Sequence, residues 1–101
     1  MINDIILKGN AYHSLDEKQK EIGKGFIVNV GELQGFNAEY SVFKKGNAFY
    51  TYDDNFKEIS KGFEINLGTF RNTAGKTINF EKGNAIYTYD VKFKEISKRF
   101  K

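Results

Sequence analysis

The clearest alternation of side chains along the chain lies at positions 48–53, where the sequence reads AFYTYD. Neighbouring side chains of a β-strand point to opposite faces, so Tyr50 and Tyr52 share one face, and the phenylalanine and threonine beside them share the other. The pattern returns at positions 85–90 as AIYTYD. Since both faces carry large side chains, the pattern predicts a central strand that is covered on each side.

A Gly-Asn pair precedes each of these strands and separates it from an earlier apolar run. Both residue types accept positive φ, so the pair predicts a two-residue β-hairpin turn. An aspartate ends each strand, where its carboxylate is predicted to accept hydrogen bonds from the backbone of the next turn. The pairs are Gly9-Asn10, Gly46-Asn47 and Gly83-Asn84, and the aspartates are Asp16, Asp53 and Asp90.

The segment Phe56 to Phe63 fits two structures. The spacing of Phe56, Ile59 and Phe63 suits one face of a helix, whereas in a strand Ile59 and Phe63 share a face with the lysines between them. Eight residues that include Gly62 make a poor isolated helix, so a strand is preferred. A ββα unit stays open as the alternative.

These patterns belong to a sequence that occurs three times. Positions 45–63 and 82–100 are identical at 15 of 19 residues, and positions 8–26 share 11 of 19 with the middle copy. Both offsets are 37 residues, without an insertion. A fixed period of this size predicts one supersecondary unit that recurs and buries its apolar faces against its neighbours. We expect a single repeat domain over 1–101, with units at about 1–37, 38–74 and 75–101.

Two connectors, 27–38 and 64–75, share a skeleton with a central glycine, Gly31 or Gly68, and each is predicted to hold a further short strand with a bend or bulge. Three full periods need more residues than the last copy has, since its connector is missing. The sequence therefore predicts that the C-terminal unit ends in an unpaired edge, which proteins usually cover or use for association.

The fold class that follows is all-β: an antiparallel array of three β-hairpin repeats of about 37 residues. The hairpin IYTYDVKFKEIS at positions 86–97 looks like the inner strand pair of many β-propeller blades, and the period is near a common blade length. This likeness implies a propeller-blade-like arrangement. A β-trefoil is the alternative for a single closed chain.

Composition supports strands and removes several kinds of chemistry. Aromatic residues are 16% of the chain, and there is no Pro, Trp or Cys, so disulfides and thiolate metal sites are excluded. The net charge of +3 is a mild excess on a highly charged surface. The only apolar run near the N-terminus, Ile5 to Leu7, is too short for a signal segment or a membrane span, so we expect a soluble, cytoplasmic protein without a membrane partner.

No residue pattern indicates an enzyme. His13 is the only histidine, stands where the other copies have tyrosine, and has no nucleophile in a fitting context, so it is interpreted as a half-buried aromatic substitute. A calcium role for the repeated aspartates is disfavoured because Asp90 is followed by Val91 and Lys92. No phosphate-binding glycine loop occurs. We therefore expect no catalytic residue, no metal and no cofactor.

Lysines and tyrosines recur with the period and are the candidate interaction residues. Stacked units would align the lysines in rows beside tyrosine rings, which suits a phosphate backbone and its bases. Acidic residues recur next to them, however, and interleaved charge is typical of a solvated surface. The candidates are Lys57, Lys61, Lys94, Lys98, Tyr50, Tyr52, Tyr87 and Tyr89.

The sequence thus predicts a non-enzymatic module for protein interaction or self-assembly, with a homo-oligomer expected from incompletely paired ends. Nucleic-acid binding through the lysine rows is the first alternative. Glycan binding of the lectin kind, through repeated shallow pockets, is the second.

Overall fold

The protein is almost entirely β-structure. The computed structural model describes residues 1–101, of which 59% lie in strands. Its eleven strands form three separate antiparallel sheets. The all-β prediction is therefore confirmed, while the sheets close into neither a barrel nor a propeller.

In each sheet the strand order follows the chain, as in a meander. The first sheet contains β1 (Asp4–Lys8), β2 (Ala11–Leu15) and β3 (Glu21–Phe26). The second contains β4 (Glu32–Phe36), β5 (Ser41–Lys45), β6 (Ala48–Tyr52) and β7 (Glu58–Phe63). The third contains β8 (Thr69–Ala74), β9 (Thr77–Lys82), β10 (Ala85–Tyr89) and β11 (Glu95–Phe100). Helical turns α1 (Ile27–Val30) and α2 (Glu64–Leu67) join successive sheets.

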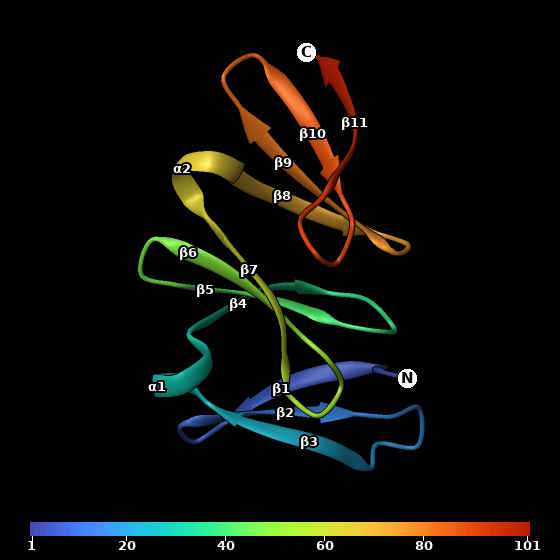
Figure 1. Cartoon of the computed structure of the whole chain (residues 1–101). Coiled ribbons are helices and arrows are strands. Elements are labelled where there is room, and N and C mark those ends of the chain that lie inside the picture. Colours follow the sequence, from blue (N-terminus) through green and yellow to red (C-terminus); the bar gives the residue numbers. More distant parts are fainter.

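The three sheets are stacked as layers along the longest dimension of the molecule, which measures 40 × 26 × 19 Å (Figure 1). The first sheet lies at one end of the stack and the third at the other, with the second between them (Figure 1). The last strand of one sheet leads through a helical turn to the first strand of the next. Only the middle sheet therefore has a neighbour on both faces.

The shorter sheet is the first, not the last. The sequence predicted an unpaired edge at the C-terminal unit, and β11 is an edge strand, but the strand that is lacking belongs to the first sheet and not to the third. Each connector strand pairs with the hairpin that follows it, as β4 does with β5 through Leu33 and Phe43. The third sheet consequently has four strands, and the first, which has no connector strand before it, has three.

The connectors contain the predicted strands β4 and β8, but also a helical turn that the sequence pattern did not indicate. Gly31 and Gly68 end these turns with φ of 88° and 96°. A Cβ at either glycine would overlap a carbonyl oxygen of the following hairpin, that of Lys44 or Glu81. Glycine is required there by close approach as well as by backbone conformation.

The hairpin turns form where they were predicted, with one difference. The glycines Gly9, Gly46 and Gly83 have φ of 62°, 63° and 64°, but the asparagines after them do not adopt positive φ. Positive φ at the first central residue alone, with glycine there, is the type II′ pattern.

The strand interpretation of Phe56 to Phe63 is confirmed. Strand β7 begins at Glu58, and Phe56 lies in the preceding turn with φ of 62°. The predicted role of the aspartate before it is also confirmed, because Asp53 Oδ1 accepts from the backbone N–H groups of Asn55 at 2.8 Å and Lys57 at 2.9 Å. Asp16 and Asp90 make the same pair of contacts.

Two apolar cores lie between the sheets, and they use equivalent positions. Between the first and second sheets, Tyr12 meets Phe43 edge to face, with ring centroids 5.1 Å apart. Between the second and third, Phe49 meets Phe80 at 4.9 Å. Each of these four residues lies 37 positions from its counterpart. Because Phe49 packs toward the third sheet and Phe43 toward the first, both faces of the middle sheet are covered, as the alternation predicted.

Candidate interaction surfaces

The four candidate tyrosines form two stacked pairs. In each pair one ring is buried and the other is partly exposed to solvent. Tyr50 and Tyr52 lie with ring centroids 6.2 Å apart, and Tyr87 and Tyr89 lie 6.3 Å apart. Tyr52 is 6% exposed and Tyr89 is 7% exposed, so these two rings belong to the cores. Tyr50 and Tyr87 are half-buried and offer part of a ring to solvent.

Two of the candidate lysines join the half-buried tyrosines. Lys61 Nζ lies 5.5 Å from the ring centroid of Tyr50 and 4.9 Å from that of Phe63. Lys98 Nζ repeats this at 5.2 Å from Tyr87 and 5.0 Å from Phe100. An ammonium at such distances is attracted to the ring face. The structure thus forms a lysine–aromatic cluster on the second sheet and another on the third, and Lys24 Nζ lies 4.8 Å from the ring centroid of Phe26 at the equivalent place on the first.

The clusters include two residues that sequence reasoning missed, the 45% exposed Phe63 and the 67% exposed Phe100. The sequence contained a signal for both. Phe63 and Phe100 each lie two positions after the lysine of the cluster, and a strand places residues with that spacing on the same face. The other two candidate lysines, Lys57 and Lys94, are not part of these clusters. They lie before strands β7 and β11 in the aspartate turns and are exposed.

The buried tyrosines are poor candidates for proton transfer. Burial raises the pKa of Tyr52 to about 12, with smaller contributions from the charge of Glu58 and from Tyr50. Burial likewise raises the pKa of Tyr89. His13 lies in the first sheet, where its Nδ1 is 2.6 Å from the carboxylate of Glu21. No nucleophile contacts this pair, so it supplies an exposed polar contact between β2 and β3.

The outer face of the third sheet is polar at positions where the middle sheet carries small or apolar residues. Gly62 faces α2, and a Cβ there would lie 2.7 Å from Leu67 Cδ1. The residue 37 positions later is Arg99, and the counterpart of the fully buried Val42 is Asn79. Another sheet of this kind could not pack there in the same way, because the arginine side chain would occupy the space.

Charged residues extend this polar face. Glu81 accepts from Arg71 at 3.1 Å and from Lys101. These two cations lower the pKa of Glu81, with the contact to Lys101 the largest cause. The equivalent pair in the middle repeat is Lys44 with Glu64 at 2.9 Å. Compared with Glu81 and Lys101, the acidic and the basic residue have exchanged positions.

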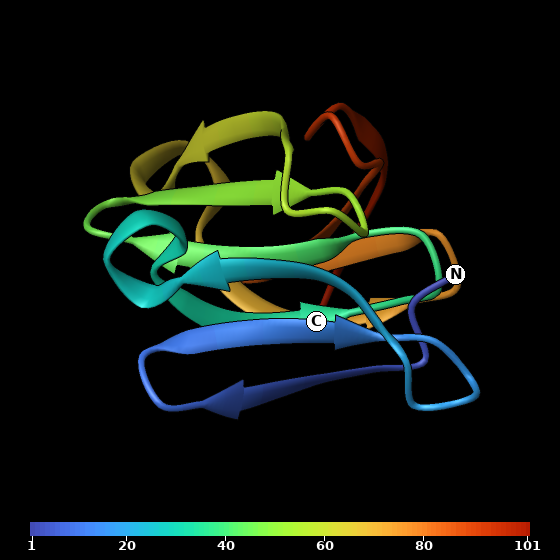
Figure 2. The same ribbon diagram turned by 90° about the horizontal axis from the view of Figure 1, so that it is seen from below.

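The opposite end of the stack has an open strand edge. Strand β1 pairs with β2 on one side only, whereas its counterparts β5 and β9 each pair on both sides. Ile6 is 38% exposed, whereas its counterparts Phe43 and Phe80 are 0% exposed. Figure 2 shows β1 along the outer margin of the molecule, with no strand beyond it.

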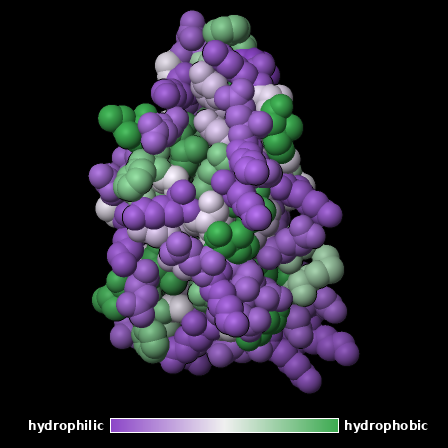
Figure 3. Space-filling model, viewed as in Figure 1, coloured by the Kyte–Doolittle hydropathy of each residue, from purple (hydrophilic) through white to green (hydrophobic).

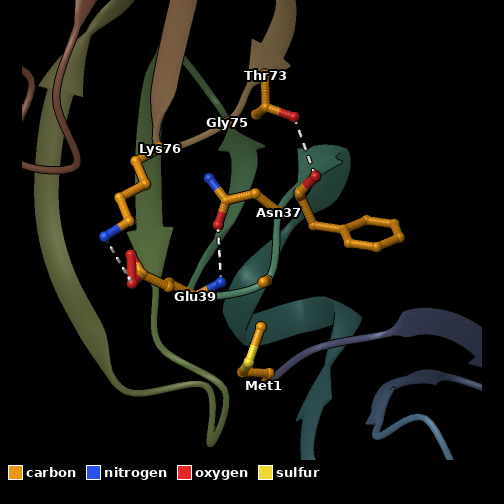
Figure 4. A pocket seen from close by; sticks show the side chains of 8 residues that line it. Met1, Asn37, Glu39, Thr73, Gly75 and Lys76 are labelled. Atoms are coloured by element: carbon orange, nitrogen blue, oxygen red, sulfur yellow. Dashed lines mark hydrogen bonds and ion pairs between the residues drawn. The ribbon is translucent and has the colours of Figure 1, made fainter.

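The surface also contains one hollow, of about 410 Å³, at the turns β4–β5 and β8–β9 (Figure 4). Lys76 and Glu39 face each other across part of it at 3.5 Å. Thr73 donates to the Phe36 carbonyl at 3.0 Å, which ties the two turns together. Sequence reasoning did not identify this hollow, because it depends on the packing of two sheets.

On the face shown in Figure 3, hydrophobic residues appear as separate patches within a largely hydrophilic surface. Neither helix is long enough to cross a bilayer. Comparison of the chain with protein-family models, with curated proteins and with solved structures gives no match.

Proposed function

We propose that this chain is a non-enzymatic, cytoplasmic module for protein interaction or self-assembly, built from three copies of a β-propeller-blade-like unit. The spacing of 37 residues between equivalent core positions supports the copies, and the meander order of each sheet supports the likeness to a blade. The stack has two unlike ends. The charged third sheet disfavours further stacking, so the first sheet is the interacting end.

The observation that carries this proposal is the exposure of Ile6 beside an unpaired strand edge. In the second sheet the equivalent position, Phe43, pairs with Leu33 of the adjoining connector strand. In the third sheet Phe80 pairs with Phe70 in the same way. The first sheet has no such strand, and no ring covers Ile6 as Tyr12 covers Phe43, so Ile6 keeps 38% of its surface exposed beside the open strand edge. An edge of this kind is a template for pairing with another chain.

The test is the molar mass in solution as a function of concentration. We expect the mass of the wild-type protein to rise above the 11.6 kDa of one chain as concentration increases, and the I6K variant to remain at that mass. The matched control is I59K, because Ile59 is 37% exposed and also lies on an edge strand, β7. This control should associate like the wild type. A wild-type protein that remains monomeric at every concentration would refute self-assembly.

Nucleic-acid binding is the second candidate, and the lysine–aromatic clusters support it. Lys61 and Lys98 lie beside exposed phenylalanine rings at equivalent places on two sheets. Their ammonium groups already cover those rings, which reduces the surface left for a base. Titration with a labelled oligonucleotide at rising salt should then show binding that weakens steeply, and a K61A/K98A double variant should bind less. The absence of binding at low salt would remove this candidate.

Glycan binding is supported least. A lectin-like site needs accessible tyrosine hydroxyls, but Tyr52 and Tyr89 are buried in the cores. Only Tyr50 and Tyr87 remain available, each beneath a lysine.

A further inference from the structure

We propose that the partner of the β1 edge is a second copy of this chain, paired through β1 itself in an antiparallel, two-fold arrangement centred on Ile6. The inference rests on the proposed interaction function and names its partner, strand register and contacts. Such a dimer would join two three-stranded sheets into one continuous sheet.

The hydrogen-bonding pattern of the first hairpin determines which backbone groups are free. The two-residue turn makes Lys8 and Ala11 the closing pair of the β1–β2 register. Since paired and unpaired residues alternate along an antiparallel strand, Ile5 and Leu7 direct their N–H and C=O groups to the open edge. Consistent with this, the N–H of Ile5 donates to the Asp4 carboxylate at 2.8 Å rather than to β2.

In the two-fold register, Ile5 of the first copy lies opposite Leu7 of the second, and Leu7 of the first copy lies opposite Ile5 of the second. The backbone groups of these residues face the edge. Once the Ile5 N–H exchanges its contact with the Asp4 carboxylate for one with the second copy, each such pair makes two hydrogen bonds across the interface. Ile6 then lies opposite Ile6 of the second copy, in a closely spaced pair without backbone hydrogen bonds. The second isoleucine takes the place that Leu33 and Phe70 have beside Phe43 and Phe80.

The charges at the two ends of β1 fit this register. With Ile6 on the axis, Asp4 of each copy lies opposite Lys8 of the other, on the same face of the joined sheet as the isoleucines. Opposite charges in such cross-strand pairs are stabilising, and like charges are destabilising. The strand DIILK is thus complementary to itself when reversed.

The difference between the two ends of the stack also favours a symmetric dimer over a head-to-tail assembly. Head-to-tail stacking would place a first sheet on the outer face of the third, where Arg99 stands at the position of Gly62. A two-fold contact uses the same edge twice and leaves the charged end in solvent. The position of β1 at the margin of the molecule leaves space for the second copy (Figure 2).

The experiment reverses the charges at the ends of β1 and measures association by sedimentation velocity from about 10 µM to about 1 mM, a range suited to a small, transient interface. The variants are D4K, K8D and the double variant D4K/K8D. Each single change gives two like-charged pairs and should weaken the dimer about tenfold or more. The double change restores both opposite-charge pairs and should restore association.

Mixing supplies an independent readout of the register. The D4K chain carries lysine at both ends of β1, and the K8D chain carries aspartate at both, so an equimolar mixture should form a mixed dimer although neither chain pairs with itself. Circular dichroism and thermal melting of each variant would establish that it is folded. Wild-type association that the single changes leave intact, or that neither the double change nor mixing restores, would overturn the β1 register while leaving self-assembly in place. A monomeric wild type would overturn both.

Discussion

Single residues decide how closely the sheets approach, and glycine has this role on the outer strands. Gly25 and Gly62 occupy equivalent positions on β3 and β7, where the next sheet packs against the backbone. A Cβ at Gly25 would lie 2.9 Å from the ring of Phe56, and one at Gly62 would lie 2.7 Å from Leu67. At the equivalent position of the third copy, β11 carries Arg99.

The first prediction is that Gly62→Ala destabilises the protein by about 1–3 kcal/mol, because the added methyl group overpacks a close contact with Leu67 of α2. Arg99→Ala is the matched control, since it changes the equivalent position on a free face and should alter the free energy of unfolding by about 0.5 kcal/mol or less. Urea unfolding monitored by tyrosine fluorescence would measure both. Equal effects of the two changes would show that Gly62 is not a packing contact.

The buried phenols make stability depend on alkaline pH. The pKa of Tyr52 is about 12 in the folded protein, whereas an exposed tyrosine has a pKa near 10. Because folding favours the neutral Tyr52 phenol, the stability that this phenol contributes is fully present below pH of about 10. It is lost as the pH rises toward about 12.

The second prediction is therefore that Tyr52→Phe reduces the loss of stability between pH of about 10 and about 12. Tyr40 and Tyr89 also have raised pKa values, so part of the loss should remain. Urea unfolding at a series of pH values would measure the change. The same alkaline slope in Tyr52→Phe and wild type would contradict the assignment.

At the scale of elements, the aspartate turns fix where each outer strand begins. Asp53 accepts two backbone N–H bonds, and the turn then places Phe56 in the left-handed region with φ of 62°. A bulky residue in that region carries strain, so the turn must be held by its contacts. The ring of Phe56 packs against Phe43 at 5.9 Å, which links the turn to the core.

The third prediction is that Asp53→Ala destabilises the protein by about 1–3 kcal/mol, because two backbone donors lose a charged acceptor. The neighbouring Asp54→Ala is the control, since its side chain accepts one hydrogen bond, from the Asn55 side chain at 3.3 Å, and no backbone N–H bond. That change should cost about 0.5 kcal/mol or less. Thermal unfolding would compare them, and the reverse ranking would refute the turn argument.

At the scale of the whole molecule, the three sheets are not equally supported. The middle sheet has a neighbour on each face, and the first has one neighbour and three strands. Cooperative stability in a stack of units depends on the intrinsic stability of each unit and on its contacts with the next. The first sheet should therefore open more readily than the middle one.

The fourth prediction concerns native-state amide exchange. Protection should be greatest in β5 and β6, which are interior strands of the middle sheet, and lower throughout β1 and β3. Samples dilute enough to be monomeric are required, since pairing would protect Ile5 and Leu7. Equal protection in the first and middle sheets would mean that the protein unfolds only as one unit.

Short patterns along the chain were enough to predict the individual strands and turns. The Gly-Asn pairs, the alternation around Tyr50 and the aspartates each act over a few residues, so the hairpins, the covered strand and the turns could be predicted from positions close together in the chain. The strand after Asp53 could also be predicted, because a segment containing Gly62 is too short and too flexible for an isolated helix.

Packing between sheets determines which sheet each connector strand joins, and therefore which hairpin lacks a connector strand. A repeat can be divided at any point of its period, and hydrophobic pattern alone does not choose between the hairpin before and the hairpin after a connector. Gly31 and Gly68 favour the hairpin that follows, because they end α1 and α2 with positive φ and allow the chain to pack closely against that hairpin. The same packing buries Tyr52 and Tyr89, leaves Lys61 and Lys98 on rings at the surface, and leaves β1 with a free edge, since burial and edge pairing depend on contacts between residues far apart in the sequence.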